Sequence, residues 1–147
     1  MKKLFFTALV LISTLSSMAQ KNNYMTFRGE IANKNSDAIF ITDGRNKLIK
    51  KIQISSEGVF KDTLNVVPGR YSLSDGNEFT IVYLKNGFDL TLKMDTKMFD
   101  ESIIYTGKGA LENNFLAKNS LFEEQTDMGS LLAATEVDFL KGLDKKK

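Results

Sequence analysis

The side chains that most often carry chemistry are unevenly represented in this chain. Among its 147 residues there is no Cys, no His and no Trp. Thiolate chemistry, disulfides, cysteine-ligated metals, serine–histidine triads and imidazole zinc sites therefore cannot be built from its own side chains. Carboxylates, lysines, hydroxyls and tyrosines remain. We predict no catalytic residue, no cofactor-binding residue, no metal ligand and no cofactor.

Two acidic clusters contain the residue types that bind divalent cations. Asp95, Asp100 and Glu101 follow one predicted strand, and the run Asp-Gly-Asn-Glu at 75–78 lies between two others. Oxygen ligands of this kind bind calcium when they occur at the spacing of a calcium loop. Neither cluster has such a spacing. We therefore predict a solvated turn at the first cluster and a hairpin loop at the second.

Phosphate and sugar binding have weaker signals. Gly107-Lys108-Gly109 precedes a predicted helix but lacks the spacing of a phosphate-binding loop, so we interpret it as a flexible joint between strand and helix. The 18 acidic residues supply many carboxylate pairs for glycoside hydrolysis, and nothing singles out one pair. Four tyrosines could stack on a sugar ring: Tyr24, Tyr71, Tyr83 and Tyr105.

The first nineteen residues have the features of an export signal. Lys2 and Lys3 precede a twelve-residue apolar stretch over 4–15, and small residues stand before the bond between Ala19 and Gln20, where we predict cleavage. A helix of that length covers about 18 Å, less than the roughly 30 Å of a bilayer core, so we expect no stable membrane span after signal removal. We predict an exported protein of the periplasm or cell envelope.

The charge balance argues against nucleic acid as a partner. The whole chain has 20 basic and 18 acidic residues, and removal of Lys2 and Lys3 with the leader leaves 18 of each sign. A basic surface that could bind phosphates is therefore not indicated.

Apolar and polar residues alternate in short segments between residues 24 and 106. This period is typical of half-buried strands. Eight strands are predicted, over 24–31, 38–42, 47–54, 59–66, 70–74, 78–84, 88–95 and 102–106. The short connections favour a mostly β fold class, an antiparallel β-sandwich or open barrel, within a β domain assigned to residues 20–107.

Asn86-Gly87 gives the most specific local prediction. This dipeptide favours a two-residue type I′ turn, because both positions need positive φ. The sixth and seventh strands would then form a hairpin. Its pairs on the core face would be Tyr83 with Leu90, Ile81 with Leu92 and Phe79 with Met94. Val82 and Leu84 would lie on the opposite face, under a cover supplied by the C-terminal segment.

After the last predicted strand the pattern becomes helical. Leu111, Phe115 and Phe122 recur at helical spacing among helix-forming residues. A short loop then precedes a second helical pattern, which carries Leu132, Phe139, Leu140 and Leu143. We predict two C-terminal helices within residues 108–147 and interpret this segment as a linker cut short.

Several runs carry a family resemblance. They are Phe27-Arg28-Gly29-Glu30-Ile31, Gly58-Val59-Phe60, Pro68-Gly69-Arg70-Tyr71, the run 84–90 and, most characteristic, the run 103–116. Over roughly residues 24–140 the chain resembles the N-terminal β-rich domain, itself of unknown function, of exported thiol–disulfide oxidoreductases of the TlpA/ResA-like kind. A thioredoxin domain follows in that family. Its Cys-x-x-Cys pair has no counterpart here, so no catalytic residue can be carried over.

Two functions remain open. The resemblance implies a non-catalytic accessory or scaffold domain of a periplasmic thiol–disulfide oxidoreductase system, with a C-terminal or separate thioredoxin-like domain as partner. The alternative is a free-standing exported module that binds a glycan, a peptide or another envelope component. In both cases we expect no enzyme activity from this chain alone. A hydrolase that uses carboxylates alone is a remote third reading.

Overall fold

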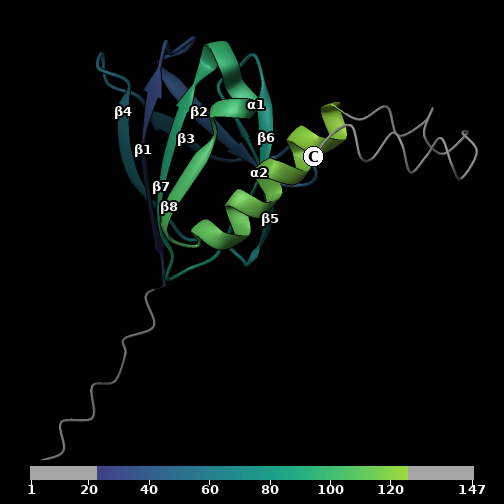
Figure 1. Cartoon of the computed structure of the whole chain (residues 1–147). Coiled ribbons are helices and arrows are strands. Elements are labelled where there is room, and N and C mark those ends of the chain that lie inside the picture. Colours follow the sequence, from purple (N-terminus) through teal and green to yellow (C-terminus); the bar gives the residue numbers. More distant parts are fainter. Residues whose placement is uncertain (1–22, 126–147) are drawn as a thin grey trace, which may run out of the picture.

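The computed structural model describes residues 23–125 as two four-stranded sheets that pack face to face, with a helix along one side (Figure 1). The strands are β1 (Met25–Ala32), β2 (Ala38–Thr42), β3 (Leu48–Gln53), β4 (Val59–Leu64), β5 (Gly69–Ser74), β6 (Phe79–Leu84), β7 (Asp89–Asp95) and β8 (Ile104–Lys108). The predicted mostly β sandwich is confirmed, and each predicted strand bound lies within two residues of the observed one.

Strands distant in sequence are neighbours in both sheets. Sheet A has the order β4-β1-β7-β8, and sheet B has the order β3-β2-β5-β6. All neighbouring strands are antiparallel except β1 and β7, which are parallel. The chain therefore crosses between the sheets four times, after β1, β3, β4 and β6.

Three helical segments follow β7. A 3₁₀ turn, η1 (Thr96–Met98), and a single helical turn, α1 (Phe99–Ser102), connect β7 to β8. After β8 comes α2 (Ala110–Gln125), which confirms the first predicted C-terminal helix. The second predicted helix, the predicted export signal and the Ala19–Gln20 cleavage position lie outside the described residues.

The core lies between the inner faces of the two sheets. Alternation along each strand directs every second side chain inward, so that apolar residues of both sheets meet away from water. Its fully buried members are Met25, Phe27, Leu90, Leu92 and Tyr105 from sheet A, and Ile39, Ile41, Ile52, Leu73, Val82 and Leu84 from sheet B. Burial of this apolar surface is the main term that stabilises the sandwich.

The hairpin predicted at Asn86-Gly87 is wrong. A turn is present, since Phe88 N–H donates to the carbonyl of Lys85 at 3.1 Å, but only Gly87 of its two central residues has a positive φ, of +86°. That is the geometry of a type II turn. Gly87 N–H also donates to the carbonyl of Tyr24 at 2.9 Å, which ties the turn to the start of β1. The chain therefore passes from β6 in sheet B to β7 in sheet A.

The predicted face of β6 is wrong for the same reason. Because β6 pairs with β5 instead of β7, Val82 and Leu84 point into the core and are fully buried. Phe79, Ile81 and Tyr83 lie on the outer face of sheet B. The prediction for β7 is confirmed, because Leu90, Leu92 and Met94 are buried there.

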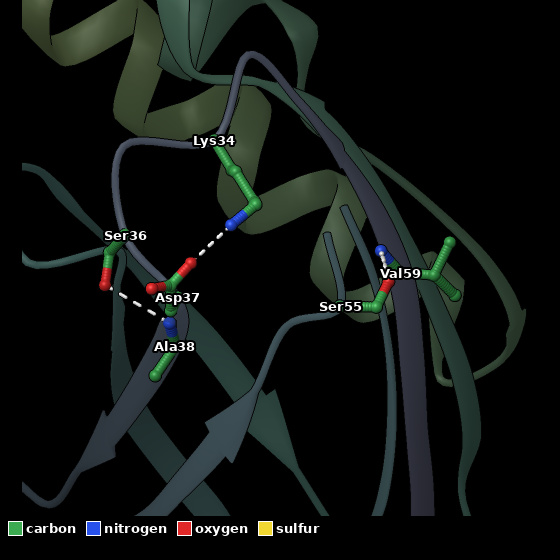
Figure 2. Close-up of polar contacts among 6 residues, drawn as sticks. All are labelled: Lys34, Ser36, Asp37, Ala38, Ser55 and Val59. Atoms are coloured by element: carbon green, nitrogen blue, oxygen red, sulfur yellow. Dashed lines mark hydrogen bonds and ion pairs between the residues drawn. The ribbon is translucent and has the colours of Figure 1, made fainter. Parts of the chain in front are cut away.

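Local polar contacts fix the loop between β1 and β2 and the turn between β3 and β4 (Figure 2). In the loop, Lys34 forms an ion pair with Asp37, and Ser36 Oγ accepts a hydrogen bond from the N–H of Ala38 at 3.2 Å. The ammonium of Lys34 lowers the pKa of Asp37. In the turn, Ser55 Oγ accepts from Val59 N–H at 3.1 Å. These contacts stabilise the conformations of the loop and the turn.

The two open sides of the sandwich are closed differently. On one side the edge strands β3 and β4 approach each other, and Lys50 Nζ lies 3.0 Å from Asp62 Oδ1. On the other side the edge strands are β6 and β8, and α2 contacts both of them (Figure 1). The second side carries the features described next.

Candidate functional site

Asn113 attaches α2 to the edge of sheet B. Its Oδ1 accepts a hydrogen bond from Tyr83 N–H at 2.7 Å, and its Nδ2 donates to the Tyr83 carbonyl at 2.9 Å. Nδ2 also donates to the Gly109 carbonyl at 2.8 Å, and Asn113 is 0% exposed. The side-chain amide therefore replaces the peptide of a neighbouring strand at an edge whose N–H and C=O would otherwise be unpaired.

Asn114 attaches the same turn of α2 to the edge of sheet A. Its Oδ1 accepts from Tyr105 N–H at 2.8 Å, and its Nδ2 donates to the Tyr105 carbonyl at 2.8 Å. Tyr105 belongs to β8 and Tyr83 to β6, so two consecutive asparagines bridge the two sheets through one helix. Hydrogen bonds to both sheets fix the position of α2 more tightly than apolar contact alone would.

The joint that leads into α2 depends on glycine. Gly107 and Gly109 have φ values of +86° and +103°, a region that favours glycine. A Cβ at Gly109 would lie 2.3 Å from the ring of Phe88, which packs over the start of the helix. The flexible joint predicted at 107–109 is wrong, because Gly107 and Lys108 are paired residues of β8 and only the closely packed Gly109 connects this strand to α2.

A groove lies between α2 and the neighbouring strands β5 and β6 of sheet B. Its volume is about 580 Å³, within the range of small-molecule sites. Its lining residues come from three elements: Gly69, Arg70, Tyr83, Leu111, Glu112, Phe115 and Leu116. The walls are mainly apolar, with one basic and one acidic side chain. Leu111 and Phe115 are 83% and 68% exposed, so this surface has uncovered apolar area that water disfavours.

The outer face of sheet B extends this apolar surface. Register places Phe79, Ile81 and Tyr83 in one row along β6, with Ser74, Ser72 and Arg70 opposite them on β5. Phe79 is 66% exposed. A smaller depression of about 290 Å³ lies between Phe79, Ile81 and the loop at 43–46. An apolar row on β6 therefore lies beside a polar row on β5.

The outer face of sheet A is polar by comparison. Arg28 forms an ion pair with Asp89, and Lys93 Nζ lies 3.4 Å from Glu30 Oε2. Charges of both signs pair across neighbouring strands on this face. It also exposes Val59 and Ile104, which come from the edge strands β4 and β8. We place the candidate binding surface on sheet B and α2, because the larger groove and the more exposed apolar side chains lie there.

The residues of the first acidic cluster serve local structure. Asp95 Oδ1 accepts hydrogen bonds from Lys97 N–H at 3.0 Å and from Asn33 Nδ2 at 2.8 Å, which lower the pKa of Asp95. It thereby caps η1. Asp100 and Glu101 follow in α1, so the predicted turn is a short helical connection. Within residues 23–125 no three acidic side chains gather closely enough to hold a metal ion.

The second acidic cluster is a turn, as predicted. Asp75 is buried between β5 and β6, and its Oδ1 accepts from the N–H groups of Asn77 and Glu78 at 2.9 Å. Its Oδ2 accepts from Asn35 Nδ2 at 3.1 Å. All these contacts hold the turn between the strands.

The four tyrosines do not form one sugar-stacking site. Tyr105 is buried in the core, and burial raises the pKa of its hydroxyl. Tyr71 is half-buried and donates its hydroxyl to the Val67 carbonyl at 2.7 Å; burial and the nearby Asp43 carboxylate raise its pKa. Tyr24 lies before β1. Only Tyr83 borders the groove.

Comparisons with known proteins leave the family open. The chain matches no family model, no curated protein and no solved structure. Over the described part of the chain, no helix is long and apolar enough to cross a membrane.

Sequence reasoning missed Asn113 and Asn114. Asparagine is a poor helix former, and two in succession inside a predicted helix are a signal that the side chains have another task. The partner strands could not be identified from that signal, because Tyr83 is thirty residues away in the chain.

Proposed function

We propose that this chain is a non-catalytic accessory domain of an exported thiol–disulfide oxidoreductase system, in which the sandwich holds a redox domain in a defined orientation. The observation that carries the proposal is the attachment of α2 to both sheets through Asn113 and Asn114. A helix that is fixed in this way can transmit the orientation of the sandwich to a domain joined to it or bound beside it.

The amino-acid composition also supports a positioning role for this chain and a redox role for another domain. Thiol–disulfide exchange requires a thiolate, and the chain has no cysteine. The redox step must therefore take place in another domain. The resemblance to TlpA/ResA-like proteins supplies the kind of domain, one with a thioredoxin fold and a Cys-x-x-Cys pair.

The first test is genetic. We expect the DNA downstream of this reading frame, read in all three frames, or a neighbouring gene, to encode a Cys-x-x-Cys motif in a thioredoxin-like sequence. Absence of such a motif in both places would remove the main support for the proposal.

The second test is kinetic and uses that redox partner with the full chain. Asn113→Ala with Asn114→Ala should raise the KM of the partner for a protein disulfide and leave its turnover of a small disulfide reagent unchanged, because only orientation is lost. Lys61→Ala, on the outer face of sheet A, is the matched control. An equal effect on both substrates, or none on either, would contradict a positioning role.

A second candidate is a free-standing module that binds a glycan or a peptide. It is favoured by the row of Phe79, Ile81 and Tyr83 on the outer face of β6, in which Phe79 is 66% exposed. Because the chain has no Trp, intrinsic tyrosine fluorescence can report a ligand near Tyr83 during titration with glycan fragments and peptides. Saturable binding that Phe79→Ala abolishes and Lys61→Ala preserves would support this candidate, and silence across both ligand classes would reject it.

A further inference from the structure

Three large apolar side chains form a stripe along the outside of α2. Leu111, Phe115 and Phe122 are 83%, 68% and 40% exposed, and their spacings of four and seven residues place them on one face of a helix. The opposite face carries the buried Asn113 and Ala117. A stripe of this length on a soluble protein indicates a surface that another segment covers.

The sequence that follows α2 repeats the apolar spacing of this stripe in reverse order. Leu132, Phe139 and Leu143 have spacings of seven and then four residues, the reverse of the spacings on α2. When two helices pack antiparallel, the two residue numbers of every facing pair add up to the same value. In a single register, all three pairs meet that condition: Phe122 with Leu132, Phe115 with Phe139 and Leu111 with Leu143.

Charge agrees with the same register. Lys118 of α2 comes opposite Glu136, and Glu112 comes within one position of Lys141. Opposite charges that flank an apolar seam favour one alignment of two helices over its neighbours. The four residues at 126–129 are a sufficient connection, since helix–helix loops in bundles commonly have two to eight residues.

We propose that residues 130–143 dock as an antiparallel helix on the Leu111–Phe115–Phe122 stripe of α2. From Leu111 to Phe122, and from Leu132 to Leu143, a helix rises by the same distance of about 16 Å. Leu143 then lies at Leu111, over the groove that Arg70 and Tyr83 border. This proposal does not depend on the proposed function.

One consequence concerns the groove. Its occupant is the chain's own C-terminal segment, so the groove is not free for a small molecule. The smaller depression between Phe79 and Ile81 stays open.

Cysteine pairs test the register directly, because the chain has no cysteine of its own. A disulfide requires Cα atoms about 4.4–6.8 Å apart. In the full chain, Leu111→Cys with Leu143→Cys and Phe115→Cys with Phe139→Cys should oxidise rapidly to a disulfide-linked monomer. Leu111→Cys with Leu132→Cys is the control, since those positions lie at opposite ends of the proposed helix pair and should oxidise at least tenfold more slowly.

The outcomes separate the alternative occupants. Equal oxidation rates in all three pairs would overturn the proposal, because they would show a segment without a fixed register. Disulfide-linked dimers in place of monomers would overturn it in favour of a second copy of the chain. Hydrogen exchange on the unmodified chain is independent of the substitutions: amides of 130–143 should be protected at least tenfold, and exchange at the rate of an unfolded peptide would also overturn the proposal.

Discussion

The side-chain amide of Asn113 pairs with the peptide of Tyr83 in both directions, accepting from its N–H at 2.7 Å and donating to its carbonyl at 2.9 Å. The pair forms on the side of β6 that faces away from β5, where β6 has no neighbouring strand. A side chain thus completes the sheet, and the position of α2 is coupled to the integrity of the β6 edge.

Asn113→Ala should destabilise the protein by about 2–3 kcal/mol, because it removes three hydrogen bonds made by a fully buried side chain, one of them to the buried carbonyl of Gly109. Asn114→Ala is the matched comparison. Asn114 is only part-buried, so water can replace its bonds to Tyr105, and we expect a loss of about 1 kcal/mol. Urea unfolding measures both losses, and equal losses would contradict the difference in burial.

Gly29→Ala should destabilise the centre of sheet A. A Cβ at Gly29 would lie 2.5 Å from the Leu92 carbonyl oxygen and 2.6 Å from the ring of Phe60, so strand or ring must move, at a cost of about 1–3 kcal/mol. Gly44→Ala is the control, because a Cβ there meets nothing within 4 Å. Thermal unfolding should show a lower Tm for the first variant only.

Tyr105→Phe should stabilise the protein by about 1 kcal/mol at neutral pH. The hydroxyl of Tyr105 is buried and has no hydrogen-bond partner among the described residues, so its desolvation is uncompensated. Tyr71→Phe is the control and should be destabilising, since it removes the bond to Val67. A loss of stability in Tyr105→Phe would mean that the hydroxyl makes a favourable contact.

Tyr105→Phe should also change how the stability of the protein depends on pH above pH 10. Burial raises the pKa of Tyr105 above its ordinary value of 10.0. Because the pKa is raised in the folded state, only the unfolded state ionises as the pH rises above about 10, and ionisation of Tyr105 then favours unfolding. The wild-type protein should therefore lose stability above pH 10 more steeply than Tyr105→Phe, as measured by urea unfolding at a series of pH values.

Asp43 should contribute to stability at the acid end. Its carboxylate accepts hydrogen bonds from the N–H groups of Arg45 and Lys47, at 2.8 and 3.0 Å, and these lower the pKa of Asp43 below its ordinary 3.8. Because the folded-state pKa is the lower one, the contribution is complete above about pH 4 and is lost as the pH falls through the folded-state value.

Asn at this position keeps an acceptor oxygen but does not titrate. The unfolding free energy of Asp43→Asn should therefore fall less between about pH 5 and about pH 2 than that of the wild type. Glu57→Gln, in the next turn, is the charge-matched control. Parallel pH profiles for Asp43→Asn and wild type would contradict the prediction, and NMR titration of the Asp43 carboxyl measures its pKa directly.

The strands could be predicted from sequence because each alternates with period two, and Met25, Phe27, Leu90 and Leu92 lie on the faces that the alternation indicates. The segment Phe79–Leu84 is different. It is apolar on both faces, so periodicity alone does not determine which face is buried. Pairing with β5 and cover by α2 decide it, and both are tertiary relationships.

The turn at Asn86 shows why local signals can mislead. Asn86-Gly87 favours a hairpin when nothing else acts on it. Here the side chain of Asn86 accepts from the N–H of Val66 at 3.0 Å and donates to Asn65 Oδ1 at 2.9 Å. Those contacts come from the connection between β4 and β5, which a local pattern does not contain. The groove beside α2 could not be predicted because it needs the same long-range placement.

The two open sides of the sandwich should respond differently to added salt. Added electrolyte weakens the attraction between Lys50 and Asp62, which are both partly exposed, but has little effect on the neutral amide bonds of Asn113 and Asn114. Concentrated salt should thus weaken the contact between β3 and β4 and leave the attachment of α2 to β6 and β8 unchanged, while the buried apolar core keeps the two sheets together.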